Sequence, residues 1–291
     1  MQALDRLLAR RPDGLLYHYT TQRGLLGVIK NNEIWATDIR YLNDASEFRL
    51  ACDLAIEVID QRIAARPDKA HRTALAEMKE AAGTSGINVS VVSFSTKGDL
   101  LSQWRAYGEV SSGFSLGFEY DTLKSAADAE RWIITPCIYR RAEQIELMNA
   151  LVDDVLEKLI QETAEETAEA RHIHGGDMAY YLHRYAGIFK DESFSEESEW
   201  RLISRPLNCT LPRYDYREGR STIIPYYKFP LARDDAGNLL LKEVVVGPSP
   251  HPDLARRSVD SLLVKTRILK PPLAPVTGAK VRNSSIPYRN W

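Results

Sequence analysis

The chain of 291 residues has few cysteines and no long apolar run. Cys52, Cys137 and Cys209 are scattered and odd in number, which fits neither a zinc spacing nor a disulfide framework and favours a reducing compartment. No stretch approaches the roughly 20 apolar residues that a bilayer requires, and the first residues lack the pattern of a secretory signal. We therefore expect a cytoplasmic protein with no membrane partner.

Net charge and the common catalytic motifs are also missing. The 38 Lys and Arg residues nearly balance the 40 Asp and Glu residues, so overall charge does not indicate a nucleic-acid or membrane partner. There is no P-loop, no GxGxxG, no HExxH, no GxSxG and no paired CxxC. His172 and His174 stand beside a glycine pair with no cysteine nearby, so a solvated loop is favoured over a metal site.

What the sequence does contain is a series of strand-like runs with helices grouped between them. Runs rich in β-branched and aromatic residues predict strands at 14–20, 33–38, 87–96, 113–120, 131–139, 198–204, 221–229, 240–248 and near 266–269. Helical periodicity covers 2–10, 21–32, 41–65, about 141–190 with a turn near 172–177, and 251–264. This order predicts an α+β protein rather than a regular βαβ winding. Because no long linker occurs, we expect a single domain, 1–291, with a helical insertion at about 141–190.

The stretch FSEESEWRLIS, residues 194–204, combines a buried-strand pattern with several carboxylates. If the alternation of a strand starts at Glu197, then Glu197, Glu199 and Arg201 share one face, and the two carboxylates stand roughly 7 Å apart. One interpretation is an exposed edge strand, where a surface ion pair of Glu199 with Arg201 would contribute about 0.5 kcal/mol. The other is the floor of a functional site.

Polar side chains on two other strands favour the second interpretation. His18 and Thr20 share one face of the first strand, and Ser93 and Ser95 share one face near the end of a central strand. The alternatives are a half-buried histidine with its hydrogen bonds satisfied and a strand end with exposed hydroxyls. Since an α+β domain brings strand faces together, we expect these side chains to converge.

Two further clusters suit a ligand. Trp104, Arg105 and Tyr107 combine aromatic rings with a guanidinium, which fits a planar or phosphorylated ligand, although Trp104 also suits a core position.

Asn43 and Glu47 lie at the start of a long predicted helix. Helix capping explains an asparagine there and leaves the glutamate without a structural role.

Four ordered blocks resemble a widespread bacterial family of unknown function. The blocks are YHYT, NDxxE, WxxYG and ExEWR, which stand here at Tyr17–Thr20, Asn43–Glu47, Trp104–Gly108 and Glu197–Arg201. They extend over most of the chain. The match itself implies no chemistry.

The opening of the chain, through the helix that follows YHYT, also resembles the start of the ADP-ribosyltransferase superfamily, which includes toxins that modify nucleic acid. Asn31 and Asn32 occupy positions where those toxins prefer glycine, and asparagine tolerates the same left-handed backbone. The resemblance implies an ADP-ribosyltransferase-like fold, a split β-sheet that grips NAD in a cleft and is flanked by helices.

The resemblance also implies roles for individual residues. His18 matches the first-strand position, Ser93 or Ser95 the middle-strand hydroxyl, and Glu199 the later-strand acid with Glu197 as its companion. Tyr107 and Trp104 stand in for the aromatic residue that stacks on nicotinamide. The expected catalytic residues are Glu199, Glu197 and His18, and the expected NAD-binding residues are His18, Thr20, Asn43, Glu47, Ser93, Ser95, Trp104, Arg105 and Tyr107.

The expected function is that of an NAD-dependent ADP-ribosyltransferase, with NAD as substrate and a nucleic acid or protein as acceptor, in a toxin or phage-defence effector. Cleavage of the nicotinamide–ribose bond builds positive charge on the sugar, and a fixed carboxylate stabilises that charge. The alternatives are an NAD glycohydrolase, in which water is the acceptor, and a non-catalytic module that senses nucleotides or nucleic acid.

Overall fold

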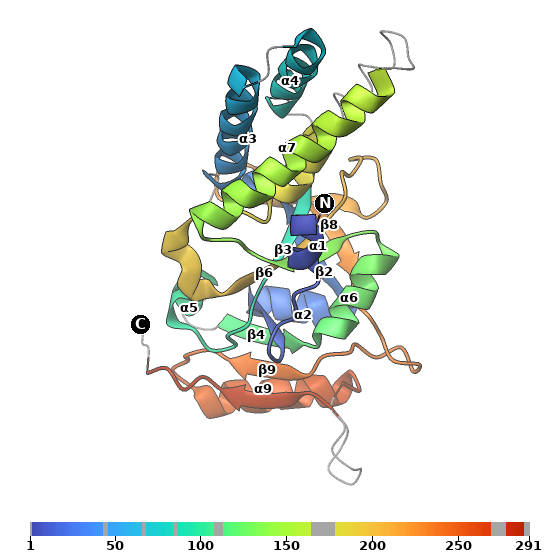
Figure 1. The fold of residues 1–291 in the computed structure, drawn as a ribbon. Helices are drawn as coiled ribbons and strands as arrows, with labels where there is room; N and C mark the ends of the chain where they lie inside the picture. The colour runs from blue at the N-terminus through green and yellow to red at the C-terminus, as the bar shows by residue number, and fades with distance from the viewer. Residues whose placement is uncertain are drawn as a thin grey trace.

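The computed structural model describes residues 2–42, 46–65, 68–83, 87–107, 113–163, 178–268 and 278–287, with the backbone alone at 2–3, 46–48, 107 and 162–163. A ten-stranded sheet with helices on both faces forms the body of the molecule (Figure 1). The α+β class predicted from the sequence is confirmed. In the part of the chain that is described, no helix is both long and apolar enough to cross a bilayer.

The strands and helices follow one another without a repeated βαβ order. The strands are β1 Leu16–Thr21, β2 Glu33–Asp38, β3 Ser90–Ser95, β4 Gly113–Phe118, β5 Ile133–Pro136, β6 Glu199–Ile203, β7 Tyr214–Glu218, β8 Ile223–Pro230, β9 Glu243–Val246 and β10 Lys280–Asn283. The helices are α1 Gln2–Leu8, α2 Gln22–Asn31, α3 Ser46–Ala65, α4 Lys69–Ala82, α5 Leu101–Tyr107, α6 Tyr120–Ala129, α7 Arg141–Thr163, α9 Pro252–Lys265 and a helical stretch at 178–186. Two 3-10 helices are η1 Ile39–Tyr41 and η2 Glu192–Glu197.

Strand β3 joins the parts of the sheet. The strand order is β10-β9-β4-β1-β3-β2-β8-β7, while β6 pairs with β3 and β5 pairs with β6. Along one edge, β3 pairs with β6 over its last five residues, 91–95. Along its other edge, Ser95 pairs with Tyr17 of β1 and Val91 pairs with Thr37 of β2. Neither β1 nor β2 pairs with residues 92–94, and we call this unpaired edge the strand gap.

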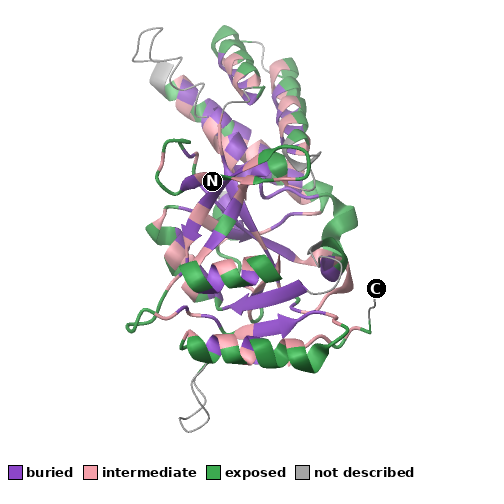
Figure 2. Ribbon diagram, turned by 180° about the vertical axis from the view of Figure 1, so that it is seen from behind, coloured by how far each residue is buried: buried purple, intermediate pink, exposed green. Residues whose placement is uncertain are grey.

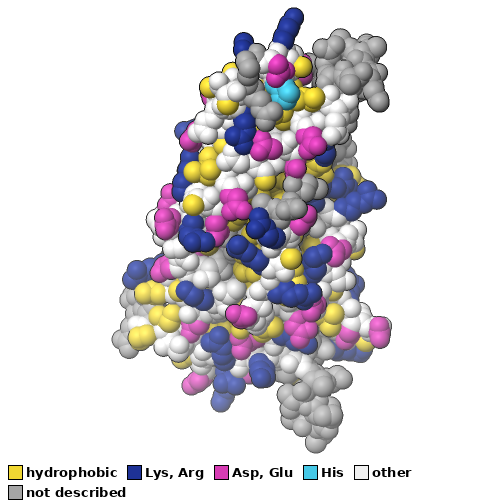
Figure 3. Space-filling model, viewed as in Figure 1, with side chains coloured by type: hydrophobic (Ala, Val, Ile, Leu, Met, Phe, Trp, Pro, Cys, Tyr) yellow, Lys and Arg dark blue, Asp and Glu magenta, His cyan; other side chains and the backbone are white. Residues whose placement is uncertain are grey.

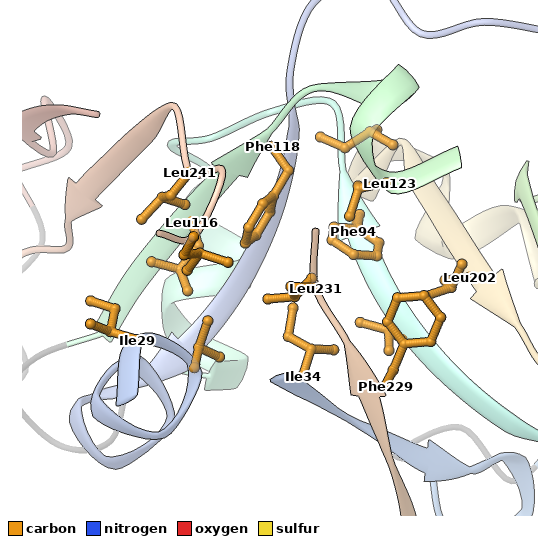
Figure 4. Packing of buried hydrophobic residues seen from close by; sticks show 14 of the residues in the cluster. Ile29, Ile34, Phe94, Leu116, Phe118, Leu123, Leu202, Phe229, Leu231 and Leu241 are labelled. Atoms are coloured by element: carbon orange, nitrogen blue, oxygen red, sulfur yellow. The ribbon is translucent and has the colours of Figure 1, made fainter. Parts of the chain in front are cut away.

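One face of the sheet carries a core that continues under the strand gap. Figure 4 shows Leu116 and Phe118 of β4, Phe94 of β3 and Phe229 of β8 pointing toward a common interior. These residues are all 5% exposed or less. Burial of apolar surface at roughly 25 cal/mol per Å² is what holds the two sides of the gap together.

A second core lies on the opposite face. Val91 and Ile203 pack there with Leu54 of α3, Met78 of α4 and Met148 of α7. The three helices stand together at one end of the molecule (Figure 1). Figure 2 shows that the strands are largely buried, whereas α9 keeps an exposed outer side. The helices cover Val91 near the start of β3, and Ser93 and Ser95 lie farther along this strand.

Most predicted elements are confirmed. The predicted strand near 266–269 is wrong for residues 266–268, because the chain turns there after α9, with Arg267 in the left-handed region at φ 59°. The tolerance of asparagine at the end of α2 is confirmed, since Asn32 has φ 53° and caps the helix. Within the predicted helical insertion, the turn near 172–177, including His172 and His174, lies outside the described residues.

Candidate functional site

A pocket of about 100 Å³ lies at the strand gap. It brings together five of the predicted site residues from three different segments of the chain. The side chains that line this gap pocket are Tyr17, His18, Tyr19, Trp35, Thr37, Leu42, Val91, Val92, Ser93, Phe94, Ser95, Gln103, Glu197 and Glu199.

Glu199 is the buried acid of the gap pocket. Only 5% of the residue is exposed, and Arg201 Nε donates a hydrogen bond to its Oε1 at 2.7 Å. Lys190 Nζ donates to its Oε2. Burial alone would raise the pKa of Glu199, but the charges of Arg201 and Lys190 outweigh burial and lower it to about 2. The carboxylate is therefore ionised at neutral pH and held by two cations.

Lys190 connects Glu199 to the second acid of the gap pocket. Its Nζ lies 2.5 Å from Glu197 Oε2 as well as within hydrogen-bond distance of Glu199. Burial would lower the pKa of Lys190, but the two carboxylates raise it well above its ordinary value. No pattern in the sequence indicated that this lysine, from the segment after the 178–186 helix, would lie between the two glutamates.

The sequence-based placement of Glu197 on the strand is wrong. Glu197 ends the 3-10 helix η2, and Ser198 adopts a left-handed conformation with φ 46° before β6 begins at Glu199. Because a left-handed residue interrupts strand alternation, Glu197 and Glu199 are brought together by Lys190 rather than by the pleat. Both still line the pocket.

The alternative of an exposed edge strand is also wrong. Strand β6 lies between β3 and β5, with Trp200 paired to Phe94 on one side and to Pro136 on the other. Glu199 and Arg201 are 5% and 2% exposed, and Arg201 Nη1 also donates to the Gly187 carbonyl at 3.0 Å. Their pair is a buried one, for which loss of either partner is costly.

The two serines of β3 have different roles. Ser95 Oγ donates to the Glu197 carbonyl at 2.7 Å and accepts from the Lys97 amide at 2.9 Å, so it fixes the turn that carries Glu197. Ser93 lines the gap pocket, and its hydroxyl has no hydrogen-bond partner among the described residues. Of the two, Ser93 has the hydroxyl that is free to meet a ligand.

His18 forms the wall opposite the acids. Its Nδ1 lies 3.0 Å from the Ser93 carbonyl, and its ring lies against Phe94, 5.9 Å between centroids. Burial lowers the pKa of His18 below its ordinary value, so the ring is neutral at pH 7. Since a carbonyl only accepts, Nδ1 carries the proton. The other nitrogen, Nε2, is then an acceptor and has no partner within the described ranges.

Register places His18 and Glu199 on opposite faces of the sheet. Tyr17 pairs with Ser95, and Ser95 pairs with Glu199, so these three share a face while His18 points to the other. They meet in one pocket only because β1 and β2 diverge at the strand gap. The sequence analysis expected His18 and the serines to be neighbours because strand faces converge. They are neighbours in the structure because the strand gap opens between the two faces.

Several other predicted binding residues lie away from the gap pocket. Thr20 packs its hydroxyl against the start of α2, where a Cβ on Gly24 would come 1.9 Å from Thr20 Oγ1. Trp104 is 3% exposed, donates from Nε1 to Asp99 at 2.8 Å and therefore occupies the core position that the sequence also allowed. Arg105 is exposed on α5 and does not line the pocket. Asn43 and the side chains of Glu47 and Tyr107 lie outside the described residues.

Aromatic residues that the sequence did not single out form the rest of the wall. Tyr19 Oη donates to the Lys97 carbonyl at 2.7 Å, and Tyr17 Oη donates to Glu243 at 2.7 Å. Trp35 is 39% exposed, and its ring lies tilted against that of Tyr226 with 4.5 Å between ring centroids. In the sequence EIWATD, Trp35 shares a strand face with Glu33 and Thr37, and a tryptophan on the polar face of a strand is a signal that could have pointed to this wall.

Comparison with known proteins gives one match. No curated protein and no solved structure matches the chain. Residues 103–202 match the family described as "Protein of unknown function (DUF2971)". These residues include the WxxYG and ExEWR blocks and most of β6 with Glu199, and the match ends within that strand.

Proposed function

We propose that the gap pocket binds the nicotinamide–ribose end of NAD and that the protein is an NAD-dependent ADP-ribosyltransferase. The observation that supports this best is the fixed, ionised carboxylate of Glu199 in a pocket at the gap of a sheet. The neutral ring of His18 and the hydroxyl of Ser93 lie on the same pocket.

The chemistry follows from the charge that develops during the reaction. As the bond between ribose C1′ and the nicotinamide nitrogen breaks, nicotinamide leaves with the electron pair and the ribose becomes positively charged. A carboxylate that is already ionised and held in place stabilises this state more than it stabilises neutral sugar. Glu199 would act in this electrostatic way, because its low pKa makes it a poor proton acceptor.

The acceptor then attacks C1′ and loses a proton. Glu197 is the candidate for receiving that proton, because its side chain is more accessible than that of Glu199, 18% against 5%. His18 Nε2 and Ser93 Oγ would hydrogen-bond the ribose or the carboxamide. An acceptor hydroxyl or amine on a nucleic acid or protein gives ADP-ribosylation, and water gives NAD hydrolysis.

The size of the pocket limits what it would enclose. Pockets that hold a whole ligand usually measure about 300–1,000 Å³, whereas the gap pocket measures about 100 Å³. Only one end of the dinucleotide would therefore lie inside. The exposed ring of Trp35 at the rim would contact the part that remains outside.

A second candidate function is nucleotide binding without catalysis. It is favoured by the two ion pairs of Glu199, since Arg201 and Lys190 already engage both of its oxygens. In this case the pocket would hold NAD or a related nucleotide intact.

Incubation of the purified protein with NAD separates these functions. Release of nicotinamide by the wild-type chain is expected, with a loss of about 100-fold or more in Glu199→Gln if its charge stabilises the transition state. Trp35→Ala, at an exposed position, should weaken NAD binding without unfolding the chain. Transfer of labelled ADP-ribose to nucleic acid or protein distinguishes transferase from glycohydrolase.

Asp38→Asn is the matched control. Asp38 is fully buried and paired with Arg40 at 2.9 Å, but it does not line the gap pocket. A loss of nicotinamide release in Glu199→Gln and not in Asp38→Asn supports the assignment, provided that circular dichroism shows both variants folded at the assay temperature. NAD binding without nicotinamide release by the wild type would overturn the catalytic proposal in favour of the binding module.

A further inference from the structure

A second cavity lies on another side of the molecule and shares no lining residue with the gap pocket. It measures about 800 Å³ and lies among α1, the end of α6, the start of β5, the 178–186 helix and residues 205–206. Its size falls within the range of about 300–1,000 Å³ that small-molecule sites show. None of the motifs considered for the gap pocket contributes to it.

The polar lining of this cavity is mainly cationic. Lys124 is paired with Asp128, 2.5 Å between Nζ and Oδ1. Arg131, Arg184 and Arg205 line the cavity without a carboxylate partner among the described residues, and Asp5 is the only other acid on the lining. Figure 3 shows several Lys and Arg side chains, interspersed with Asp and Glu, over the middle of this side of the molecule, where α1 and α6 lie in Figure 1.

Two buried nitrogen donors on the lining are unsatisfied. Arg184 Nη2 donates to the Arg131 carbonyl at 3.3 Å, and Nη1 donates to Tyr180 Oη at 3.2 Å, which holds the guanidinium in place. Arg184 Nε and Trp132 Nε1, in contrast, are buried and have no hydrogen-bond partner in the described part of the chain. Trp132 is 3% exposed. Buried donors normally have an acceptor, so a small shift of this wall toward the acceptor oxygens of a ligand would satisfy both nitrogens.

The backbone of Arg131 supports the same interpretation. It has φ 59° in the turn that ends α6, a conformation that favours glycine because a Cβ is disfavoured there. Arginine therefore occupies the position at a conformational cost. A residue kept in a disfavoured conformation at a cavity is a reason to look for function in its side chain.

We infer that this cavity binds a small molecule through a diphosphate group. Guanidinium groups bind phosphate oxygens in pairs of parallel hydrogen bonds, and three of them match a group with more than one negative charge. The apolar part of the lining, including Leu8 and Ile134, would contact the organic part of the ligand. The inference does not depend on the function proposed for the gap pocket.

Calorimetric titration of the full chain with inorganic pyrophosphate tests the inference, with ADP as a competing ligand. We expect saturable binding of pyrophosphate, and we expect ADP to displace it. Arg205→Gln and Arg131→Gly should each weaken binding about tenfold or more, because each removes charged hydrogen bonds to the ligand. Glycine at position 131 keeps the left-handed turn, so this variant is expected to fold.

Arg267→Gly is a matched control. Arg267 has the same φ of 59° at the end of another helix, is exposed and lies outside the cavity. It should bind pyrophosphate as the wild type does. Absence of saturable binding to the wild type, unchanged binding in both cavity variants, or an equal loss in Arg267→Gly would overturn the inference.

Discussion

Lys190 determines how the two glutamates of the gap pocket behave. It is 6% exposed, and its ammonium contacts Glu197 and Glu199 together. Arg201 forms an ion pair with Glu199 as well, 2.7 Å between Nε and Oε1. Removal of Lys190 would leave Glu197 without this partner and Glu199 with one cation in a buried setting, and breaking a buried ion pair in this way usually costs about 3–5 kcal/mol.

We therefore expect Lys190→Met to lower the free energy of unfolding by about 3–5 kcal/mol, measured by urea denaturation. Lys79→Met provides the control, because Lys79 pairs with Asp60 at an exposed position where a pair contributes about 1 kcal/mol or less. Equal losses in the two variants would show that the buried network adds nothing beyond an ordinary surface pair.

The pKa of Glu199 predicts a dependence of stability on pH. The folded protein holds this pKa at about 2, below the ordinary value of 4.5, so the unfolded chain binds more protons between these pH values. The stabilisation is complete above pH 4.5 and is lost as the pH falls toward 2. Glu199→Gln should flatten the acid limb of a plot of unfolding free energy against pH. An unchanged slope in the variant would contradict the pKa.

At the scale of elements, local pattern predicted most strands but not where the site begins. The β-branched run of β3 and the sequence EIWATD of β2 are local signals, and both strands form as expected. The 3-10 helix η2 ends just before the left-handed Ser198. Because this position holds a serine and not a glycine, the sequence does not mark it. Strand β7, Tyr214–Glu218, is rich in charged residues and became a strand by pairing with β8.

The strand gap itself could not be read from any one segment. It arises because β1 and β2, which are joined by α2, use the two ends of the same edge of β3. The ion pair of Lys190 with Glu199 could not be predicted for a similar reason, since it depends on how the segment between them folds. The histidine, the two serines and the two glutamates of the gap pocket were predictable, whereas their relative placement depended on tertiary pairing.

Asp99 connects α5 with the segment after β10. It accepts from Trp104 Nε1 of α5 at 2.8 Å, from Ser284 Oγ at 2.5 Å and from the Ser285 amide at 2.7 Å, just after β10. Burial alone would raise the pKa of Asp99, but these hydrogen bonds outweigh burial and lower it. The segment after β10 is thus attached beside α5 through one carboxylate.

Asp99→Ala should release this segment and lower the free energy of unfolding by about 1–3 kcal/mol, because the buried Trp104 Nε1 loses its acceptor. Hydrogen exchange measured by mass spectrometry should become faster in peptides that contain residues 284–287. Asp121→Ala, which removes an exposed partner of Arg11, should leave exchange there unchanged. Unchanged protection at 284–287 in Asp99→Ala would contradict the role of this carboxylate.

At the scale of the whole molecule, the two cores are linked by alternating residues of the same strands. Val91 and Ile203 point into one core, and Val92 and Leu202 point into the other. A disturbance of either core therefore reaches the other through β3 and β6. We expect the sheet to unfold as one unit in spite of the strand gap.

Leu54→Ala and Leu116→Ala test this, one in each core, both at residues with no exposed surface. Each should lower the free energy of unfolding by about 2–5 kcal/mol and shift one shared transition. Far-ultraviolet circular dichroism and tryptophan fluorescence should give coincident curves. Leu254→Ala, at a side chain that is 65% exposed, should change little. Separate transitions for the two variants would show that the cores unfold independently.

The strand gap leaves a main-chain group available for recognition. The Ser93 carbonyl points toward His18 at the unpaired edge, and because both peptide groups of a strand residue face the same edge, the Ser93 N–H is directed there too. A carboxamide is chemically a peptide group and could complete that edge as a short piece of strand would. Such a donor persists whatever side chain stands at position 93, and proline alone would remove it. Alanine scanning would consequently not detect a contribution of this donor.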